Sequence, residues 1–219
     1  AFGKKECSAC GPVLELLNVL DTYIPTPLRE TEKPFLMPVD KVYQIKGRGT
    51  VAASQIERGT IKKGQRVEIV GKALDPVETV VTGIEIFGKS TDQAVAGDDA
   101  GILLRGLART DLKRGQVIAE VGTVKAYTRF KAEVYVLKKD EGGRSKPFFD
   151  GYCPQFYIRT ADVTGTLKVE SETSMGIPGD YLTMEIELVD PIAIETGLRF
   201  AIREGGQTVG AGVVTKIIS

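Results

Sequence analysis

The stretch Lys139–Gly151, KDEGGRSKPFFDG, continues directly into Tyr152–Gly165, YCPQFYIRTADVTG, and together they decide how the second half of the chain folds. A third stretch, Arg199–Val213, RFAIREGGQTVGAGV, has the same character. Its glycines, like Gly142 and Gly143, allow backbone conformations that other residues avoid. Short aromatic segments between such bends are typical of β-strands. Hydrogen-bonding side chains lie beside the bends at Arg144, Gln155, Thr164 and Glu204.

Short strands, separated by turns every ten or so residues, are predicted from Lys33 onward. Alternation of polar and apolar residues indicates strands at Arg66–Val70, Glu78–Phe87, Phe130–Leu137 and Leu182–Leu188. Turn signals separate them at Lys63-Gly64, Ala96-Gly97-Asp98, Arg114-Gly115, Pro178-Gly179-Asp180 and Glu195-Thr196-Gly197. This spacing predicts an all-β fold of two closed antiparallel β-barrels in tandem, at 33–121 and 122–219.

One short α-helix is predicted to precede the strands. In residues 12–24, PVLELLNVLDTYI, apolar side chains recur at helical spacing, and Pro12 suits a first helical turn. The helix should end before Pro25, because proline disfavours helical conformation in the preceding residue. The proline-rich, charged segment Ile24–Pro34 then predicts a linker. Residues 1–32 therefore form a separate first unit.

Composition excludes several classes of protein. Of the 219 residues, 42% are hydrophobic and 26% are charged, as in ordinary soluble globular proteins. No apolar run approaches the roughly 18 residues that span a bilayer, and the first residues do not resemble a signal peptide. A formal net charge of zero argues against a general nucleic-acid binder, but not against a protein that reads one end of an RNA.

The chain has no histidine, so it lacks the commonest general base and the commonest metal ligand. Cys7 and Cys10 have the spacing of half a zinc site, but Cys153 is the only other cysteine. A structural zinc ion needs four ligands, so we expect no bound metal and interpret the pair as small residues in a loop before the helix. No nucleophile–base pair is visible, and so few cysteines favour an intracellular or organellar protein.

The three opening stretches, together with GRGTV (Gly47–Val51), TGIEIF (Thr82–Phe87) and LLRG (Leu103–Gly106), closely resemble translation elongation factor Tu. The resemblance runs from about Leu14 to Ser219 in the family's order and spacing. It implies two β-barrels that follow a nucleotide-binding domain, with the predicted helix as the last helix of that domain.

The nucleotide domain of this family carries a phosphate-binding loop, GxxxxGK[ST], and no such string occurs in the 219 residues. The pieces GRGTV and GGQTVGAG lie in strand-like sequence, where glycine more often marks a bulge or close backbone packing. The resemblance implies GTP and Mg²⁺ for the intact family protein. For this chain we expect neither cofactor, no GTP binding and no enzymatic activity of its own.

The resemblance implies that the first barrel binds the aminoacyl end of transfer RNA. The matching positions are Ile45, Val51 and Leu103 for an apolar adenine slot, Glu85 for the ribose hydroxyl, and Tyr43 and Asp99 for the amino-acid pocket. Without the resemblance, Glu85 is interpreted as an outward-facing strand residue and Tyr43 as a rim aromatic. The sequence departs from the family pattern at Lys41, Ala53, Ser54, Gln55 and Asp99.

The second barrel is implied to grip the tRNA stem. Its matching positions are Arg144, Gln155, Thr164, Glu204 and Gly205, with Arg114 at the end of the first barrel for the 5′ phosphate. Gly142, Gln155 and Ala201 match the face on which the nucleotide domain docks. Cys153 and Gln207 replace arginines and Ser145 replaces a histidine, so two phosphate partners are lost.

The leading hypothesis is therefore an RNA-binding part of elongation factor Tu, which carries aminoacyl-tRNA to the ribosome in a GTP-dependent manner. The implied partners are aminoacyl-tRNA, the ribosome, the protein's own GTP-binding domain and nucleotide-exchange factor Ts, with no membrane. The implied compartment is the mitochondrial matrix, or alternatively a bacterial cytoplasm. The lost arginines favour an alternative, a divergent non-catalytic paralogue used as a scaffold or assembly subunit.

Overall fold

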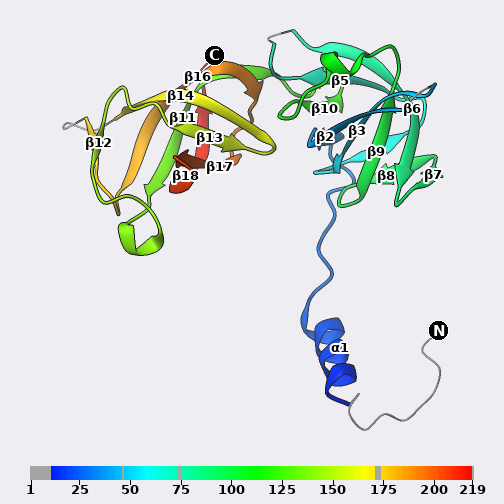
Figure 1. Ribbon diagram of the computed structural model, residues 1–219, viewed down its shortest axis with the longest axis horizontal. Coiled ribbons are helices and arrows are strands. Elements are labelled where there is room, and N and C mark those ends of the chain that lie inside the picture. Colours follow the sequence, from blue (N-terminus) through cyan, green and yellow to red (C-terminus); the bar gives the residue numbers. More distant parts are fainter. Residues whose placement is uncertain (1–10, 46, 74, 171–173, 219) are drawn as a thin grey trace.

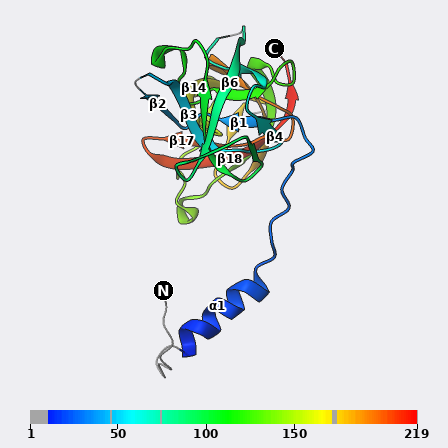
Figure 2. The same ribbon diagram turned by 90° about the vertical axis from the view of Figure 1, so that its right-hand side faces the viewer.

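The computed structural model describes residues 11–45, 47–73, 75–170 and 174–218. It has one α-helix and two β domains along the chain (Figure 1). Helix α1 (Gly11–Tyr23) confirms the predicted helix, one residue earlier at each end. None of its residues is buried, so its apolar side chains all face outward. Figures 1 and 2 both show α1 apart from the β domains, at the end of an extended linker.

The first β domain is built on one eight-stranded antiparallel sheet of order β1-β10-β5-β6-β9-β3-β2, with β7 paired to β6. Strands β4 and β8 form a separate two-stranded sheet. Its apolar core includes Phe35, Ile84, Ile102 and Ile118. The strands are β1 (Leu36–Pro38), β2 (Lys41–Ile45), β3 (Gly49–Gln55), β4 (Thr60–Lys62), β5 (Arg66–Val70), β6 (Val77–Ile86), β7 (Lys89–Thr91), β8 (Gln93–Val95), β9 (Asp99–Leu104) and β10 (Val117–Glu120).

The prediction of two closed barrels is corrected in this first domain, whose sheet curls without closing. Strands β1 and β2 are its two edges, and no ladder joins them within the described ranges. Pro38 ends β1 and has no amide hydrogen for further pairing. The next residue, Val39, bonds back to the β10 side, because its N–H donates to the Gln116 carbonyl at 2.8 Å. The other edge of β1 is bonded to the segment before β4, because the Leu36 N–H donates to the Arg58 carbonyl and the Glu57 N–H donates to the Leu36 carbonyl, both at 3.0 Å.

The second β domain is a closed six-stranded barrel of order β11-β16-β14-β13-β17-β18, which confirms that part of the prediction. It closes because β11 pairs with both β16 and β18. Strict alternation of buried and exposed residues in β14 directs one face of that strand into the core around Phe130, Phe156 and Phe200. The strands are β11 (Ala126–Val136), β12 (Phe148–Phe149), β13 (Gln155–Ile158), β14 (Ala161–Val169), β15 (Met175–Gly176), β16 (Tyr181–Ala193), β17 (Arg199–Glu204) and β18 (Gln207–Ile217).

The glycine-rich piece GGQTVGAG has the structural role predicted for it. The ladder between β17 and β18 shifts register between Ile202 and Arg203, which marks a bulge. A Cβ atom on Gly212 would lie 2.7 Å from the ring of Phe200, so only glycine lets the strand pass over that ring.

An inter-domain seam joins the two domains. Arg159 is central to it, with a side chain only 7% exposed. Its guanidinium donates to Glu57 at 2.7 Å, to Glu195 at 2.8 Å and to the Ala193 carbonyl at 2.9 Å. Arg58 makes a two-pronged pair with Glu195 at 2.7 and 3.0 Å. Charged pairs and a small apolar cluster that includes Leu36, Val70, Val124 and Ala193 therefore hold the domains together.

Candidate nucleic-acid interface

The predicted aminoacyl-end residues come together because strand pairing aligns them on one outer face. In one row, Tyr43 on β2 faces Val51 on β3, and Val51 faces Leu103 on β9. In the next row, Ala53 faces Gly101 and Gly101 faces Glu85. Side chains on one face of a strand alternate, so both rows point away from the core.

An open hollow of about 510 Å³ lies over these rows, and we call it the outer-face hollow. Val51 forms its apolar floor and is only 5% exposed, although it points away from the domain core. Gly101 leaves space there, since a Cβ atom on it would lie 3.3 Å from a Val51 methyl. The lining residues that the sequence predicted are Tyr43, Ile45, Val51, Glu85 and Asp99.

Glu85 is already engaged in an ion pair in this hollow. Its carboxylate lies 2.7 Å from the guanidinium of Arg48, in a pair that is partly exposed on both sides. Arg48 lies inside the GRGTV motif and was not among the residues predicted to bind tRNA. An ionised carboxylate offers about four lone-pair positions, so Glu85 can hold Arg48 and still accept a hydroxyl.

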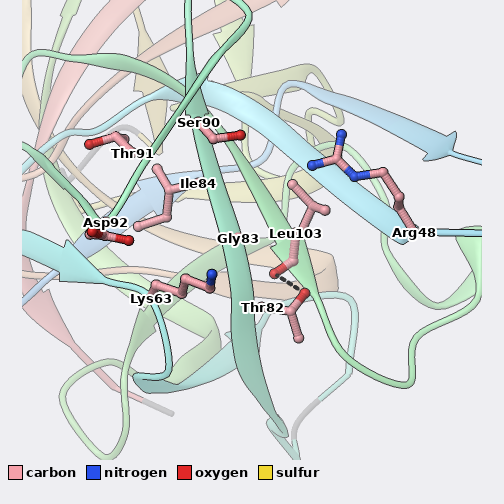
Figure 3. Close-up of a pocket in the computed structure, with 9 residues that line it drawn as sticks. All are labelled: Arg48, Lys63, Thr82, Gly83, Ile84, Ser90, Thr91, Asp92 and Leu103. Carbon is pink, nitrogen blue, oxygen red and sulfur yellow. Dashed lines mark hydrogen bonds between the residues drawn. The ribbon is translucent and has the colours of Figure 1, made fainter.

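Leu103 lines a second, neighbouring hollow of about 360 Å³, which we call the Leu103 hollow (Figure 3). Figure 3 shows the Arg48 side chain beside Leu103. The Thr82 hydroxyl donates to the Leu103 carbonyl at 3.3 Å, where the β6–β9 ladder shifts register. The structure thus places Leu103 next to the outer-face hollow and outside its lining. The Arg48–Glu85 pair links the two, because each partner lines one of them.

Phe87 and Gly88 are among the lining residues of the outer-face hollow that were not predicted from the sequence. Phe87 has a positive φ of 50° and a side chain that is almost fully exposed. A phenylalanine that is both exposed and in a left-handed conformation is unusual, because the apolar ring is normally buried and bulky residues rarely adopt a positive φ. The signal available in the sequence was the end of the TGIEIF motif, because Phe87 directly follows the last residue of β6.

Arg144 is turned into the second domain. Its guanidinium lies 4.8 Å from the Tyr152 ring centre and 5.3 Å from that of Phe148. It also donates to the Lys146 carbonyl at 2.7 Å and pairs with Glu204 at 3.5 Å. With its side chain only 15% exposed, Arg144 holds this loop together and presents little charge to solvent.

Burial of the Tyr152 phenol, reinforced by the Glu204 carboxylate, raises the pKa of Tyr152 to about 12. The positive charge of Arg144 opposes this increase. Gly143 is required beside this cluster for a steric reason, since a Cβ atom on it would lie 2.3 Å from the Leu137 carbonyl oxygen.

Two lysines provide the exposed charge near Arg144. Lys139 and Lys146 are both exposed and line an open hollow of about 500 Å³ together with Glu204. We call this the Arg144 hollow. Ser145 and Gln207, where the resemblance implies a histidine and an arginine, line it as well. Both lysines lie in the segment KDEGGRSK, but neither was among the residues predicted to contact tRNA.

The remaining predicted residues occupy different parts of the outer surface. Gln155 and Thr164 are exposed cross-strand neighbours on β13 and β14. Ala201 faces Tyr157 in the β13–β17 ladder, so it lies near Gln155. Gly142 and Gly205 lie in two separate turns, the first after Glu141 and the second between β17 and β18. Cys153 is exposed near the Thr166 hydroxyl.

Arg114 lies at the end of the first domain with its side chain 70% exposed, and its Nε atom is 3.3 Å from an Asp40 oxygen. It therefore remains available to an anion, since a surface pair of this kind contributes little free energy.

No metal centre is found in the described part of the chain, where no three His, Cys, Asp or Glu side chains gather into a possible ligand group. Cys7 and Cys10 lie outside the described residues, so the expectation about zinc stays a prediction. Among the described residues, no helix is long and apolar enough to cross a membrane.

Two family models match this chain, one for each β domain. Residues 49–119 match the model described as elongation factor Tu domain 2. Residues 123–218 match the model described as the elongation factor Tu C-terminal domain. The matches follow each other in the order of the two β domains, and the first includes most of the residues that line the outer-face hollow. The chain belongs to the elongation factor Tu family and contains its domain 2 and its C-terminal domain.

Proposed function

We propose that the outer-face hollow binds the aminoacylated 3′ end of a transfer RNA. The observation that carries this proposal is the gathering of Tyr43, Ile45, Val51, Glu85 and Asp99 around one hollow. It combines an apolar floor, an aromatic rim and an ionised acceptor. Proteins recognise single-stranded RNA ends with such groups, through packing, stacking and contact with the 2′-hydroxyl.

Each group then has a distinct role. The terminal adenine packs against Val51 and Ile45, and its ribose hydroxyl donates to Glu85 beside the existing Arg48 contact. Tyr43 flanks the esterified amino acid. Asp99 is exposed and carries a negative charge, which favours a free α-amino group nearby.

The second domain would contact the backbone of the same tRNA. Lys139 and Lys146 are the phosphate partners in the Arg144 hollow, because Arg144 itself is engaged with aromatic rings. Gln155 and Thr164 contribute hydrogen bonds to sugar or phosphate. The face around Gln155 and Ala201 serves in turn as the docking face of a GTP-binding domain. Arg114 meets the 5′ phosphate.

The wider role proposed is that of a translation elongation factor, with the ribosome and exchange factor Ts as further partners. The compartment proposed is the mitochondrial matrix or a bacterial cytoplasm. GTP and Mg²⁺ would belong to a GTP-binding domain, because this chain lacks a GxxxxGK[ST] loop. Titration with a fluorescent guanine nucleotide should therefore show no saturable binding to this chain alone.

A second candidate function is that of a scaffold or assembly subunit without tRNA traffic. It is favoured by the inward orientation of Arg144, together with Cys153 and Gln207 where the family has arginines. Loss of phosphate partners weakens any nucleic-acid complex.

Binding assays with aminoacylated and uncharged tRNA separate the two functions. We expect this chain to prefer the aminoacylated form, and Glu85→Gln to weaken binding by about 1–2 kcal/mol through loss of a hydrogen bond to a charged group. The control is Glu78→Gln, which changes an exposed carboxylate that pairs with Arg66 outside the hollow. Equal and negligible affinity for both tRNAs, including when a GTP-binding domain of the family is added with GTP, would reject the carrier function.

A further inference from the structure

Glu68 is a buried carboxylate without a hydrogen-bond donor for one of its oxygens. It lies on β5, is 3% exposed, and its Oε1 atom has no partner among the described residues. Its strand neighbours cannot supply a cation, because they are Glu78 and Ala119. Arg66, two residues away on the same face, is paired with Glu78. A buried ionised group without a partner costs free energy, because the water that solvated it is not replaced.

This carboxylate lines a cavity of about 260 Å³ at the junction of the two domains. Val70 and Pro76 contribute walls from the first domain, and Val124, Ala126 and Tyr127 contribute walls from the start of the second. The walls are therefore mainly apolar, with an aromatic ring and one carboxylate. No residue predicted to bind tRNA lines this cavity, so it is separate from the proposed interface.

We propose that this inter-domain cavity binds a small primary amine with an apolar body. The ammonium group would donate to Glu68 Oε1, and the apolar body would pack against Val70, Val124 and Tyr127. A cavity of about 150 Å³ lined by apolar side chains holds benzene, so the space here accommodates one ring and a short arm. A cation near the tyrosine ring gains further attraction. The carboxylate selects a cation over a neutral or anionic molecule of the same shape.

Lys125 is the group in the chain that competes most directly with such a ligand. It also lines the cavity, but it is exposed, and Glu68 Oε1 has no hydrogen-bond partner among the described residues. A rotation of its side chain would place its ammonium group where the ligand's ammonium binds. The Lys125→Met variant removes this competitor while keeping an unbranched apolar stem.

Titration of isotope-labelled protein with benzylammonium tests the proposal, with amide NMR shifts as the readout. We expect saturable shifts at residues 68–70 and 122–127. Affinity should fall at least about tenfold in Glu68→Gln, because a hydrogen bond to a charged group is lost. Glu120→Gln changes an exposed carboxylate on the neighbouring strand β10 and should leave affinity unchanged. Benzyl alcohol, which has the same ring without the charge, should bind more weakly to the unaltered protein.

Three outcomes would overturn the proposal. Equal binding of benzyl alcohol and benzylammonium would show an apolar cavity without charge recognition. Absence of saturable binding would show that water satisfies Glu68. Binding that occurs only in Lys125→Met would show that Lys125 is the partner of Glu68 in the native protein. The comparison of the two ligands uses the unaltered chain, so it stays decisive even if Glu68→Gln fails to fold.

Discussion

The two β domains expose their functional groups in opposite ways. In the first domain, an arginine and a glutamate pair on the outside, above Val51 and Leu103, which are buried although they face away from the core. In the second domain, Arg144 lies between aromatic rings and is almost covered. The first domain therefore offers a shaped hollow with an accessible carboxylate, while in the second domain Arg144 of the GGR motif holds a loop. The same residue type is a surface group in one domain and a structural group in the other.

The largest expected effect is a loss of stability on truncating a side chain in the closed barrel core, compared with the same kind of change on the outer face of the open sheet. Phe130 is fully buried and meets Phe200 edge to face at 5.7 Å. Phe130→Ala should lower the free energy of unfolding of the second domain by roughly 3–5 kcal/mol, because it leaves a closed cavity. Leu103→Ala should cost about 2 kcal/mol, since the adjoining hollow lets solvent reach the space. Urea unfolding followed by domain-resolved NMR signals measures both, and equal losses would contradict the comparison.

A second prediction compares the two arginines directly. Arg144→Ala should destabilise the second domain by about 2 kcal/mol, because two ring contacts and a backbone hydrogen bond are lost. Arg48→Ala should cost at most about 1 kcal/mol, as expected for an exposed ion pair. Arg144→Lys serves as the control for charge, since lysine keeps the charge and loses the planar stacking. A full rescue of stability by lysine would contradict the structural role.

A third prediction concerns the seam between the domains and its dependence on pH. Burial raises the pKa of Glu195, but hydrogen bonds and charge from Arg58 and Arg159 outweigh it and lower that pKa overall. A depressed pKa means that the stabilisation is present above the ordinary pKa of glutamate and is lost as the pH falls through the depressed value. Unfolding midpoints should therefore decrease in acid.

The matched variant for this prediction is Glu195→Gln, which cannot ionise and should flatten the acid dependence. Glu133→Gln, an exposed carboxylate on β11, should leave the acid dependence as it is. An identical acid profile for Glu195→Gln and the unaltered protein would show that the seam charges do not couple the domains.

The smallest expected effect is on the salt dependence of tRNA affinity, when one positive charge is added to the second domain. Cys153 is exposed at a position where the resemblance implies an arginine, so Cys153→Arg should add one phosphate contact if tRNA binds there. The salt dependence of tRNA affinity should steepen by up to about one unit. Cys153→Ser is the neutral control, and an unchanged slope in both variants would argue that tRNA does not reach this surface.

The sequence alone determined features that depend on local periodicity and on proline. Pro25 fixed the end of α1. Period-two alternation located β5 and most of β6, β11 and β16, because every second side chain of a strand lies on the same face. The aminoacyl-end residues were grouped by the family resemblance, and Tyr43, Ile45, Val51, Glu85 and Asp99 line one hollow in the structure. The GGQTVGAG glycines were interpreted as structural because glycine inside strand-like sequence marks a bulge or close backbone packing.

Tertiary structure alone decided where chain segments meet. In the first sheet, the edge of β1 that faces away from β10 bonds to Glu57 and Arg58, which are distant in sequence, and no local pattern records that contact. Arg144 turns inward because Tyr152, Phe148 and Glu204 converge around it from separate segments. The GGR motif by itself does not indicate whether the arginine points inward or outward. The alternation of β5 predicts Glu68 as an outward strand residue, but in the structure it is buried and lines a cavity together with residues from the start of the second domain. Burial and charge pairing depend on which surfaces pack together. A strand pattern shows which face a residue lies on, but it does not show which distant segment packs against that face.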